Sequence, residues 1–299
     1  MRRDAHEQNR RSWNLVIPAH DSHKRDQAGF LRAGGHTLFP DELGLLGVDT
    51  TGWPTDHVPA DMSRESGPLA GRELLHLQCN AGQDTLSLAA RGAKVTGVDI
   101  SDEAIAFATK LSADSGIPGT FVRSDVFDWL EAAQPESFDR VFCSYGAIMW
   151  LSDLAPWGKG IAKILRPGGR FVVIDAHPMM MVLGENLELK YEYGGGAEVH
   201  DPGVHDYVAA AGTSLTPSGF EEGVKDFKNP HPNASFQWGL AEIFAALTEP
   251  GLVVERYVEY PFTRWMAFPV QTTAPDGNFY LPAGTPQIPM MFGLCAARR

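Results

Sequence analysis

Short apolar runs typical of β-strands alternate with helical stretches between residues 73 and 175, and this rhythm restricts the possible folds more than any other feature. The first two runs cover residues 73–78 and 94–100, and helical stretches follow them at 85–91 and 102–112. Strands that alternate with helices of this length predict a parallel sheet with right-handed crossovers. Further runs of the β type cover residues 120–122, 138–144 and 171–175.

Regular structure is expected again near the end of the chain. The pattern predicts a helix at 236–248, a strand at 252–260 and a last apolar run at 290–296. Between Pro178 and residue 235 the rhythm is absent, and so long a segment in a compact domain is usually a lid or a binding loop.

The leader differs in composition from the rest. It is expected to be irregular or helical, with one short helix at 41–47 and no long element, because prolines interrupt it at Pro18, Pro40, Pro54, Pro59 and Pro68. We therefore predict three parts: a leader at 1–70, a core at 71–177 and 236–299, and an inserted lid or acceptor-binding segment at 178–235.

Charge and composition narrow the class of partner. The formal net charge of −12 argues against nucleic acid or an anionic membrane, and the 43% hydrophobic content supports a real core. The basic residues near the start, Arg2, Arg3, Arg10, Arg11, Lys24 and Arg25, are interpreted as a solvated charged face. No stretch is apolar enough for a membrane span or a signal peptide, which predicts a cytoplasmic protein.

Metal and disulfide sites are not expected. Cys79, Cys143 and Cys295 share no CxxC spacing and are interpreted as buried, reduced thiols. His20 and His23 are three residues apart but lack a third ligand nearby in the sequence.

The turn between the first predicted strand and its helix, residues 78–84, carries the chemistry. A tight strand-to-helix turn lets the backbone approach a ligand. Asp99 follows Gly82 by seventeen residues, at the predicted carboxyl end of the second strand, where an acid can accept hydrogen bonds from a ribose diol. The pattern predicts nucleoside binding. A nicotinamide enzyme normally carries G-x-G-x-x-G, but Gln78 and Asn80 stand at two glycine positions, which favours a ligand without pyrophosphate, S-adenosylmethionine.

Residues 75–87, LHLQCNAGQDTLS, make the chain recognisable. It resembles the class I S-adenosylmethionine-dependent methyltransferases over residues 70–175 and 236–297, and more narrowly a bacterial small-molecule subgroup with the first motif LHLQCxxGxDTLS. The resemblance implies a Rossmann-like, mostly parallel seven-stranded sheet with helices on both faces.

The resemblance also assigns site residues. It implies that Asp99 binds the ribose hydroxyls, Ile100 packs on the adenine, Asp125 accepts from the adenine amino group beside Val126, and Ser144 and Tyr145 lie along the methionine part. The remaining cofactor-binding candidates are Trp13, His76, Gln78, Asn80, Gly82 and Thr85. His76 stands where an acid commonly sits, and asparagine at position 80 tolerates a positive φ.

Methyl transfer is an in-line displacement in which proximity and alignment can provide most of the acceleration. The catalytic candidates are Tyr145 and His177, the latter as a general base if the acceptor must lose a proton. The acceptor-binding candidates are Trp150, His177, Tyr191, Tyr193 and Trp238. The acceptor is expected to be a small molecule methylated at N, O or S, and a homodimer is compatible with the sequence. Two alternatives stay open: an inactive S-adenosylmethionine-binding protein and, less favoured, a nicotinamide-dependent oxidoreductase.

Overall fold

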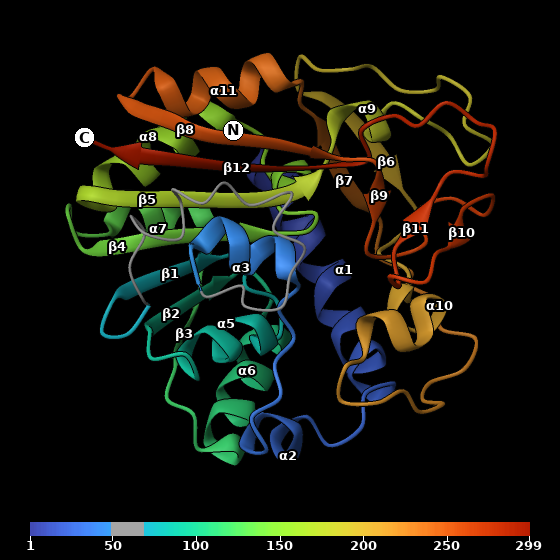
Figure 1. Ribbon diagram of the computed structural model, residues 1–299, viewed down its shortest axis with the longest axis horizontal. Coiled ribbons are helices and arrows are strands. Elements are labelled where there is room, and N and C mark those ends of the chain that lie inside the picture. The colour runs from blue at the N-terminus through green and yellow to red at the C-terminus, as the bar shows by residue number, and fades with distance from the viewer. Residues whose placement is uncertain (49–68) are drawn as a thin grey trace.

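A seven-stranded sheet in the order β3-β2-β1-β4-β5-β12-β8 forms the centre of the molecule (Figure 1). The computed structural model describes residues 1–48 and 69–299. Neighbouring strands from β3 to β5 are parallel, whereas β12 runs antiparallel to both β5 and β8. The predicted, mostly parallel sheet is therefore confirmed. The strands are β1 (Glu73–Leu77), β2 (Lys94–Asp99), β3 (Thr120–Arg123), β4 (Phe138–Ser144), β5 (Leu165–Ala176), β8 (Leu252–Tyr260) and β12 (Met291–Arg298).

Helices cover both faces of this sheet. Successive strand residues point to opposite faces, so Leu75 packs in one core with α7, α8 and α11, while Leu74 packs in another with α3 and α5. A serine cap begins α6, since the hydroxyl of Ser101 accepts a hydrogen bond from the backbone N–H of Ala104 at 3.1 Å. These helices are α3 (Pro40–Leu46), α5 (Gln83–Ala89), α6 (Asp102–Ser115), α7 (Val126–Ala132), α8 (Leu154–Ile164) and α11 (Leu240–Thr248).

The leader corrects one expectation, because it opens with a long helix. Helix α1 (Arg3–Ser22) continues through Pro18, which lies in its last turns, and buries Val16 and Ile17. Asn9 fixes it in place: its amide donates to the carbonyl of Ala234 and accepts from the backbone N–H of Ala234, both at 2.8 Å. Tertiary contacts thus outweigh the helix-breaking tendency of the proline. A short helix, α2 (Gln27–Arg32), follows, and Pro54, Pro59 and Pro68 lie outside the described residues.

The segment 178–235 is more regular than expected. A two-stranded antiparallel ribbon joins β6 (Ala197–Asp201) to β7 (Asn233–Gln237), so the helix predicted from residue 236 begins only at Leu240. The other elements beyond the sheet are α9 (Pro178–Met181), α10 (Tyr207–Ala211), the 3₁₀ turns η2 (Ile148–Trp150) and η3 (Gly212–Leu215), and the small sheet of β9 (Phe262–Thr263), β10 (Thr272–Thr273) and β11 (Phe279–Tyr280). These elements gather beyond the carboxyl ends of the parallel strands (Figure 1).

Across residues 1–48 and 69–299 no helix is both long and apolar enough to cross a membrane. In the same part of the chain no group of three His, Cys, Asp or Glu side chains is placed to hold a metal ion.

Candidate functional site

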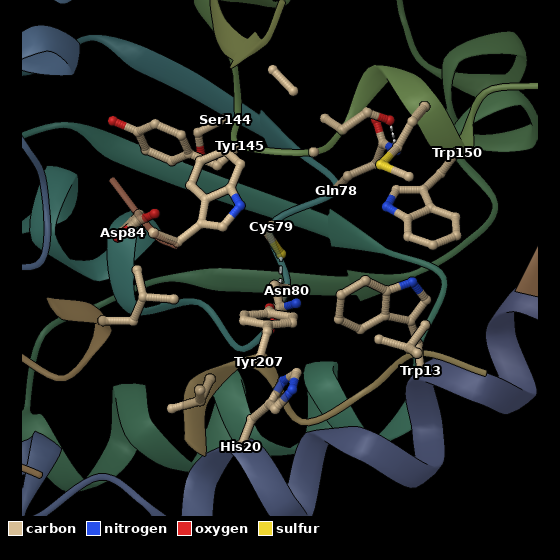
Figure 2. Close-up of a pocket in the computed structure, with 18 of the residues that line it drawn as sticks. Trp13, His20, Gln78, Cys79, Asn80, Asp84, Ser144, Tyr145, Trp150 and Tyr207 are labelled. Atoms are coloured by element: carbon tan, nitrogen blue, oxygen red, sulfur yellow. Dashed lines mark hydrogen bonds between the residues drawn. The ribbon is translucent and has the colours of Figure 1, made fainter. Parts of the chain in front are cut away.

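A cavity of about 1070 Å³ lies at the carboxyl ends of β1, β2 and β4. Helix α1, with Trp13 and His20, and the segment around α10, with Tyr207, close it on one side (Figure 2). Residues 264–268 also line it. In an open α/β sheet this is the edge where ligands bind. Its volume slightly exceeds the range of about 300–1000 Å³ that is typical of small-molecule pockets.

The turn after β1 is tightly wound. Gln78 and Asn80 have φ values of 55° and 49°, a region that non-glycine residues rarely adopt, and Gly82 has a φ of 77°. The turn is held by Asp99, whose carboxylate accepts from the backbone N–H of Asn80 at 2.8 Å and of Ser101 at 2.9 Å. Gly82 does not line the cavity; a Cβ there would lie 2.6 Å from the Cβ of Ala108. The positive φ and the close contact with Ala108 together explain why position 82 is a glycine.

Asp99 lines the cavity from the end of β2. Burial raises its pKa, while the backbone N–H groups of Ser101, Asn80 and Ile100 oppose that rise. Each carboxylate oxygen accepts one of the two turn hydrogen bonds and has further lone-pair capacity for a ligand.

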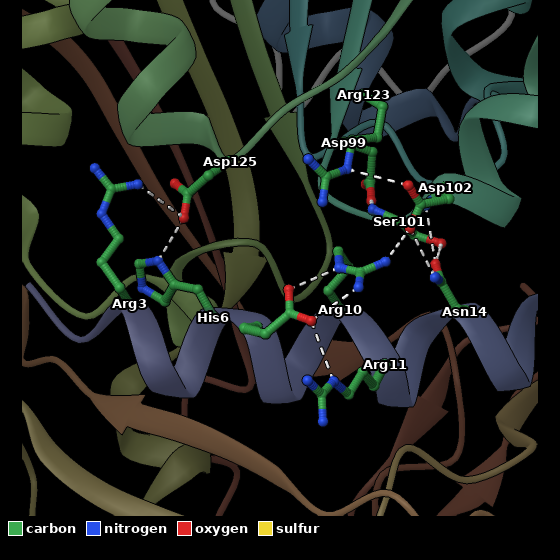
Figure 3. Close-up of polar contacts among 11 residues, drawn as sticks. Arg3, His6, Arg10, Arg11, Asn14, Asp99, Ser101, Asp102, Arg123 and Asp125 are labelled. Atoms are coloured by element: carbon green, nitrogen blue, oxygen red, sulfur yellow. Dashed lines mark hydrogen bonds and ion pairs between the residues drawn. The ribbon is translucent and has the colours of Figure 1, made fainter.

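Helix α1 contacts the ends of two strands through polar side chains (Figure 3). His6 Nδ1 lies 2.7 Å from Asp125 Oδ2, and the other carboxylate oxygen accepts from the backbone N–H of Phe127 at 2.9 Å. Burial raises the pKa of Asp125, but the hydrogen bonds from His6 and Phe127 and the charge of Arg3 oppose it. The net effect is a lowered pKa. Asn14 reaches the start of α6, where its carbonyl oxygen accepts from the hydroxyl of Ser101 at 2.7 Å.

The loop after β4 is organised by a buried acid. Asp175, near the end of β5, accepts hydrogen bonds from the backbone N–H groups of Gly146, of Ala147 at 3.0 Å and of Ile148 at 2.9 Å. This clamp holds Tyr145, which has a φ of 39°. Loops that keep such strained residues are often functional.

Two polar atoms beside this loop have no hydrogen-bond partner within the described residues, although they are buried: Tyr145 Oη and Gln78 Oε1. Gln78 also anchors the loop, because its Nε2 donates to the carbonyl of Ala147 at 2.8 Å. Both residues line the cavity. Buried polar atoms without a partner are rare in proteins, so each is a candidate ligand contact.

Aromatic rings line the side of the cavity nearest α1 (Figure 2). Trp13 packs edge-on against Trp150, with ring centroids 5.7 Å apart, and against Tyr207, at 6.4 Å. His20 packs on Tyr207 at 4.2 Å. Burial lowers the pKa of His20 to about 4, so this imidazole is neutral at physiological pH.

His76 lines the cavity but is tied into the core. Its Nδ1 lies 2.9 Å from the hydroxyl of Thr85, and burial lowers its pKa to about 3. The neutral ring therefore bridges β1 and α5 and offers no charge to a ligand. Thr85 is fully buried and does not reach the cavity.

Three acceptor-site candidates lie away from the cavity lining. His177 caps α9, since its Nδ1 accepts from the backbone N–H of Met179 at 2.9 Å, and its Nε2 lies 3.3 Å from Glu259. Trp238 donates its indole N–H to the carbonyl of Leu151 at 2.7 Å. Tyr193 is largely exposed and packs near Gly239. The cavity does include Trp13, Gln78, Asn80, Asp99, Ile100, Asp125, Val126, Ser144, Tyr145, Trp150 and Tyr191.

Comparison with known proteins agrees with this arrangement. Residues 75–173 match the family model described as a methyltransferase domain. The chain is an S-adenosylmethionine-dependent methyltransferase. It is 26% identical, over 83% of its length and 92% of the relative's, to a ubiquinone biosynthesis O-methyltransferase of Xylella fastidiosa. It is 30% identical to the enzyme of the same name from Aeromonas salmonicida, but over 42% of this chain and 54% of that relative, so this match spans about half of each.

Solved structures confirm the fold of this methyltransferase. A putative S-adenosylmethionine-dependent methyltransferase from Listeria monocytogenes superposes with a TM-score of 0.55 over 80% of this chain and 95% of that one, at 14% identity. A methyltransferase from Mesorhizobium loti gives 0.50 over 78% and 93%, at 20% identity.

Some cavity residues of the methyltransferase were missed by the sequence analysis. His6 and Tyr207 carried no motif, because their neighbours come from distant segments. Asp84 lies within the motif at 75–87 but was not chosen there as a site residue. Asp175 does not line the cavity but holds the loop after β4, and it could have been found because it ends a predicted strand at the active edge. Lys24, expected on a solvated face, lines the cavity.

Proposed function

We propose that this methyltransferase transfers the methyl group of S-adenosylmethionine to an N, O or S atom of a small molecule inside the cavity. The observation that carries the proposal is that one cavity joins the carboxylates of Asp99 and Asp125 to a compartment lined by Tyr145 and Trp265. The first two residues suit the nucleoside of the cofactor, and the compartment suits an acceptor.

The nucleoside would be held at the ends of β2 and β3. Asp99 would accept from the ribose hydroxyls with the lone pairs that its turn contacts leave free. Ile100 and Val126 line the neighbouring wall and would pack on the adenine. The adenine amino group would be recognised by the His6–Asp125 pair. If Nδ1 of the neutral ring donates to the Asp125 carboxylate, Nε2 is a hydrogen-bond acceptor. Nε2 is buried and has no hydrogen-bond partner among the described residues.

When bound, the cofactor supplies a methyl group activated by a sulfonium, so no covalent intermediate on the protein is required. The protein's contribution is to align the acceptor and exclude water. Burial raises the pKa of Tyr145 well above its ordinary value, so its phenol stays protonated and can donate a hydrogen bond. We propose Tyr145 as the group that orients the acceptor. We do not assign a base to His177, because both of its ring nitrogens face protein partners.

The acceptor compartment is mainly apolar. Phe39 and Trp265 meet Tyr145 edge-on, with centroids 5.7 and 6.2 Å from its ring. Met180 and Phe268 extend the same wall. Such a lining favours a small, largely apolar acceptor with one polar group. Because the curated relatives are named O-methyltransferases, a hydroxyl acceptor is the first to test.

The test combines binding and turnover on the full chain. Calorimetry with S-adenosylhomocysteine and with NADH should show binding of the first alone. Methyl-labelled S-adenosylmethionine is then incubated with phenols, amines and thiols, and transfer to at least one class is expected. Failure to bind S-adenosylhomocysteine contradicts the proposal. Binding without transfer to any class would support the inactive, cofactor-binding alternative.

A further inference from the structure

Lys24, which follows α1, places an ammonium group in the cavity. Two arginines of α1 are paired: Arg3 contacts Asp128 at 2.5 Å, and Arg10 contacts Glu7 at 2.8 Å. No ion pair of Lys24 is present within residues 1–48 and 69–299. Burial lowers the pKa of Lys24, while the charges of Asp21, Asp84 and Asp206 oppose that effect without forming an ion pair with it. Lys24 is half-buried, and a partly desolvated cation that faces a cavity is stabilised by a ligand of opposite charge.

Asp84 offers the opposite charge at the same end of the cavity. It lies in α5, two residues after Gly82, and it lines the cavity (Figure 2). One carboxylate oxygen accepts from the hydroxyl of Thr37, and within the described residues the other has no hydrogen-bond partner. Burial raises the pKa of Asp84, while Thr37 and Lys24 oppose the rise.

Lys24 and Asp84 line the same cavity and each charge acts on the other, but within the described residues they form no ion pair. Gln27 and Gln83 line the same part of the cavity, and the amide of Gln83 donates to that of Gln27 at 2.8 Å. A purely anionic ligand would meet Asp84 unfavourably, and a purely cationic one would meet Lys24. An α-amino-acid zwitterion satisfies both groups.

We propose that Lys24 and Asp84 form a receptor for an α-amino-acid group, with Lys24 binding its carboxylate and Asp84 its ammonium. The inference rests on the proposed function, because the aminocarboxypropyl chain of S-adenosylmethionine is the group we assign there. Asn80 and Asp84 belong to the same strand-to-helix turn, and the backbone N–H of Asn80 donates to Asp99. A ribose bound to Asp99 would therefore direct the aminocarboxypropyl chain toward Asp84.

The test compares two nucleosides that differ by this group. S-adenosylhomocysteine carries the amino-acid chain, whereas 5′-methylthioadenosine lacks it. In Lys24→Met we expect affinity for S-adenosylhomocysteine to fall by about ten- to a hundredfold, the loss of one charge-assisted hydrogen bond, with affinity for methylthioadenosine unchanged. Asp84→Asn should show the same selectivity, and Lys24→Arg should recover part of the loss. The control is Lys225→Met, which removes an exposed lysine paired with Glu222.

The α-amino-acid group could instead belong to the methyl acceptor. A second experiment therefore titrates protein that is saturated with S-adenosylhomocysteine with L-homocysteine and with L-serine. Binding of either that is lost in Lys24→Met, with S-adenosylhomocysteine affinity intact, supports the receptor with the acceptor as its ligand. The inference is overturned, without affecting the proposed function, if Lys24→Met weakens the affinity for both nucleosides equally. It is also overturned if no titration changes. A wild-type chain that binds neither nucleoside contradicts the proposed function as well.

Discussion

His6 Nδ1 lies 2.7 Å from the carboxylate of Asp125, and this contact joins the first helix of the chain to the end of the third strand. His6 also stacks on Phe127, with ring centroids 5.3 Å apart and planes within 6°. The leader is therefore part of the nucleoside wall, and the acid expected to meet the adenine already has a protein partner.

The first prediction concerns this contact. His6→Phe keeps the stacking on Phe127 but removes both ring nitrogens. We expect affinity for S-adenosylhomocysteine to fall by about three- to tenfold, the range for one hydrogen bond, measured by calorimetry. The inosine analogue of the ligand, which lacks the amino group, should bind wild type and variant alike. Equal affinity of the two proteins for S-adenosylhomocysteine would show that His6 does not read the adenine.

Asp99→Asn tests the ribose contact. The amide keeps the size of the side chain but loses the charge that would bind two hydroxyls. We expect about ten- to a hundredfold weaker binding of S-adenosylhomocysteine. The melting temperature should fall as well, because the amide can accept only one of the two backbone hydrogen bonds from Asn80 and Ser101. Asp114→Asn, at an exposed ion pair with Lys110, serves as the control. Unchanged affinity in a folded Asp99→Asn protein would be incompatible with the assignment.

Asp175→Asn should disturb the loop after β4. An amide replaces one accepting oxygen with a donor, which would face backbone N–H groups of Gly146, Ala147 or Ile148. We expect a loss of about 2–4 kcal/mol in the free energy of unfolding. Turnover should fall more than cofactor affinity, because the clamp positions Tyr145. Urea unfolding and steady-state kinetics measure the two effects. A variant with wild-type turnover would mean that the loop keeps its shape without the clamp.

Tyr191 and Tyr193 form a matched pair. Tyr191 lines the cavity, whereas Tyr193 is outside it and 45% exposed. Tyr191→Ala should raise the KM for the acceptor about tenfold or change acceptor preference, with cofactor affinity nearly intact, and Tyr193→Ala should leave both as they are. If the two variants behave alike in transfer assays, the acceptor does not contact Tyr191.

Stability should depend on pH through Asp139. Burial raises its pKa, but the backbone N–H of Glu73 and the guanidinium of Arg166, at 2.9 Å, lower it overall. A carboxyl whose folded pKa is depressed stabilises the fold above its unfolded pKa, about 3.9, and loses that contribution as the pH falls through the folded value. Asp139→Asn should therefore cost about 1 kcal/mol at pH 7, and the difference from wild type should shrink below about pH 4. Urea unfolding across this range measures it, and a difference that stays constant with pH would contradict the expectation.

The strands of the core could be predicted because each is a short apolar run between turn residues. The predicted bounds of β4 and β8, 138–144 and 252–260, match the structure. Asp99 and the turn at Asn80 were placed by the same local logic. What could not be predicted depends on distant partners: β6 pairs with β7 across more than thirty intervening residues, and His6 meets Asp125 only after the sheet is built. The long α1 was missed for a related reason, because its stability comes from Ala234 and the cavity wall.

Strand β12, formed by residues 291–298, lies inside the sheet between β5 and β8. During synthesis on a ribosome, β8 leaves the exit tunnel before β12 does, yet it can join the sheet only through β12. Until then β5 presents an unpaired edge, which is the kind of surface that invites pairing with another chain. The last step of sheet assembly therefore requires residues 291–298, and a nascent chain without them would expose both β5 and β8 to aggregation.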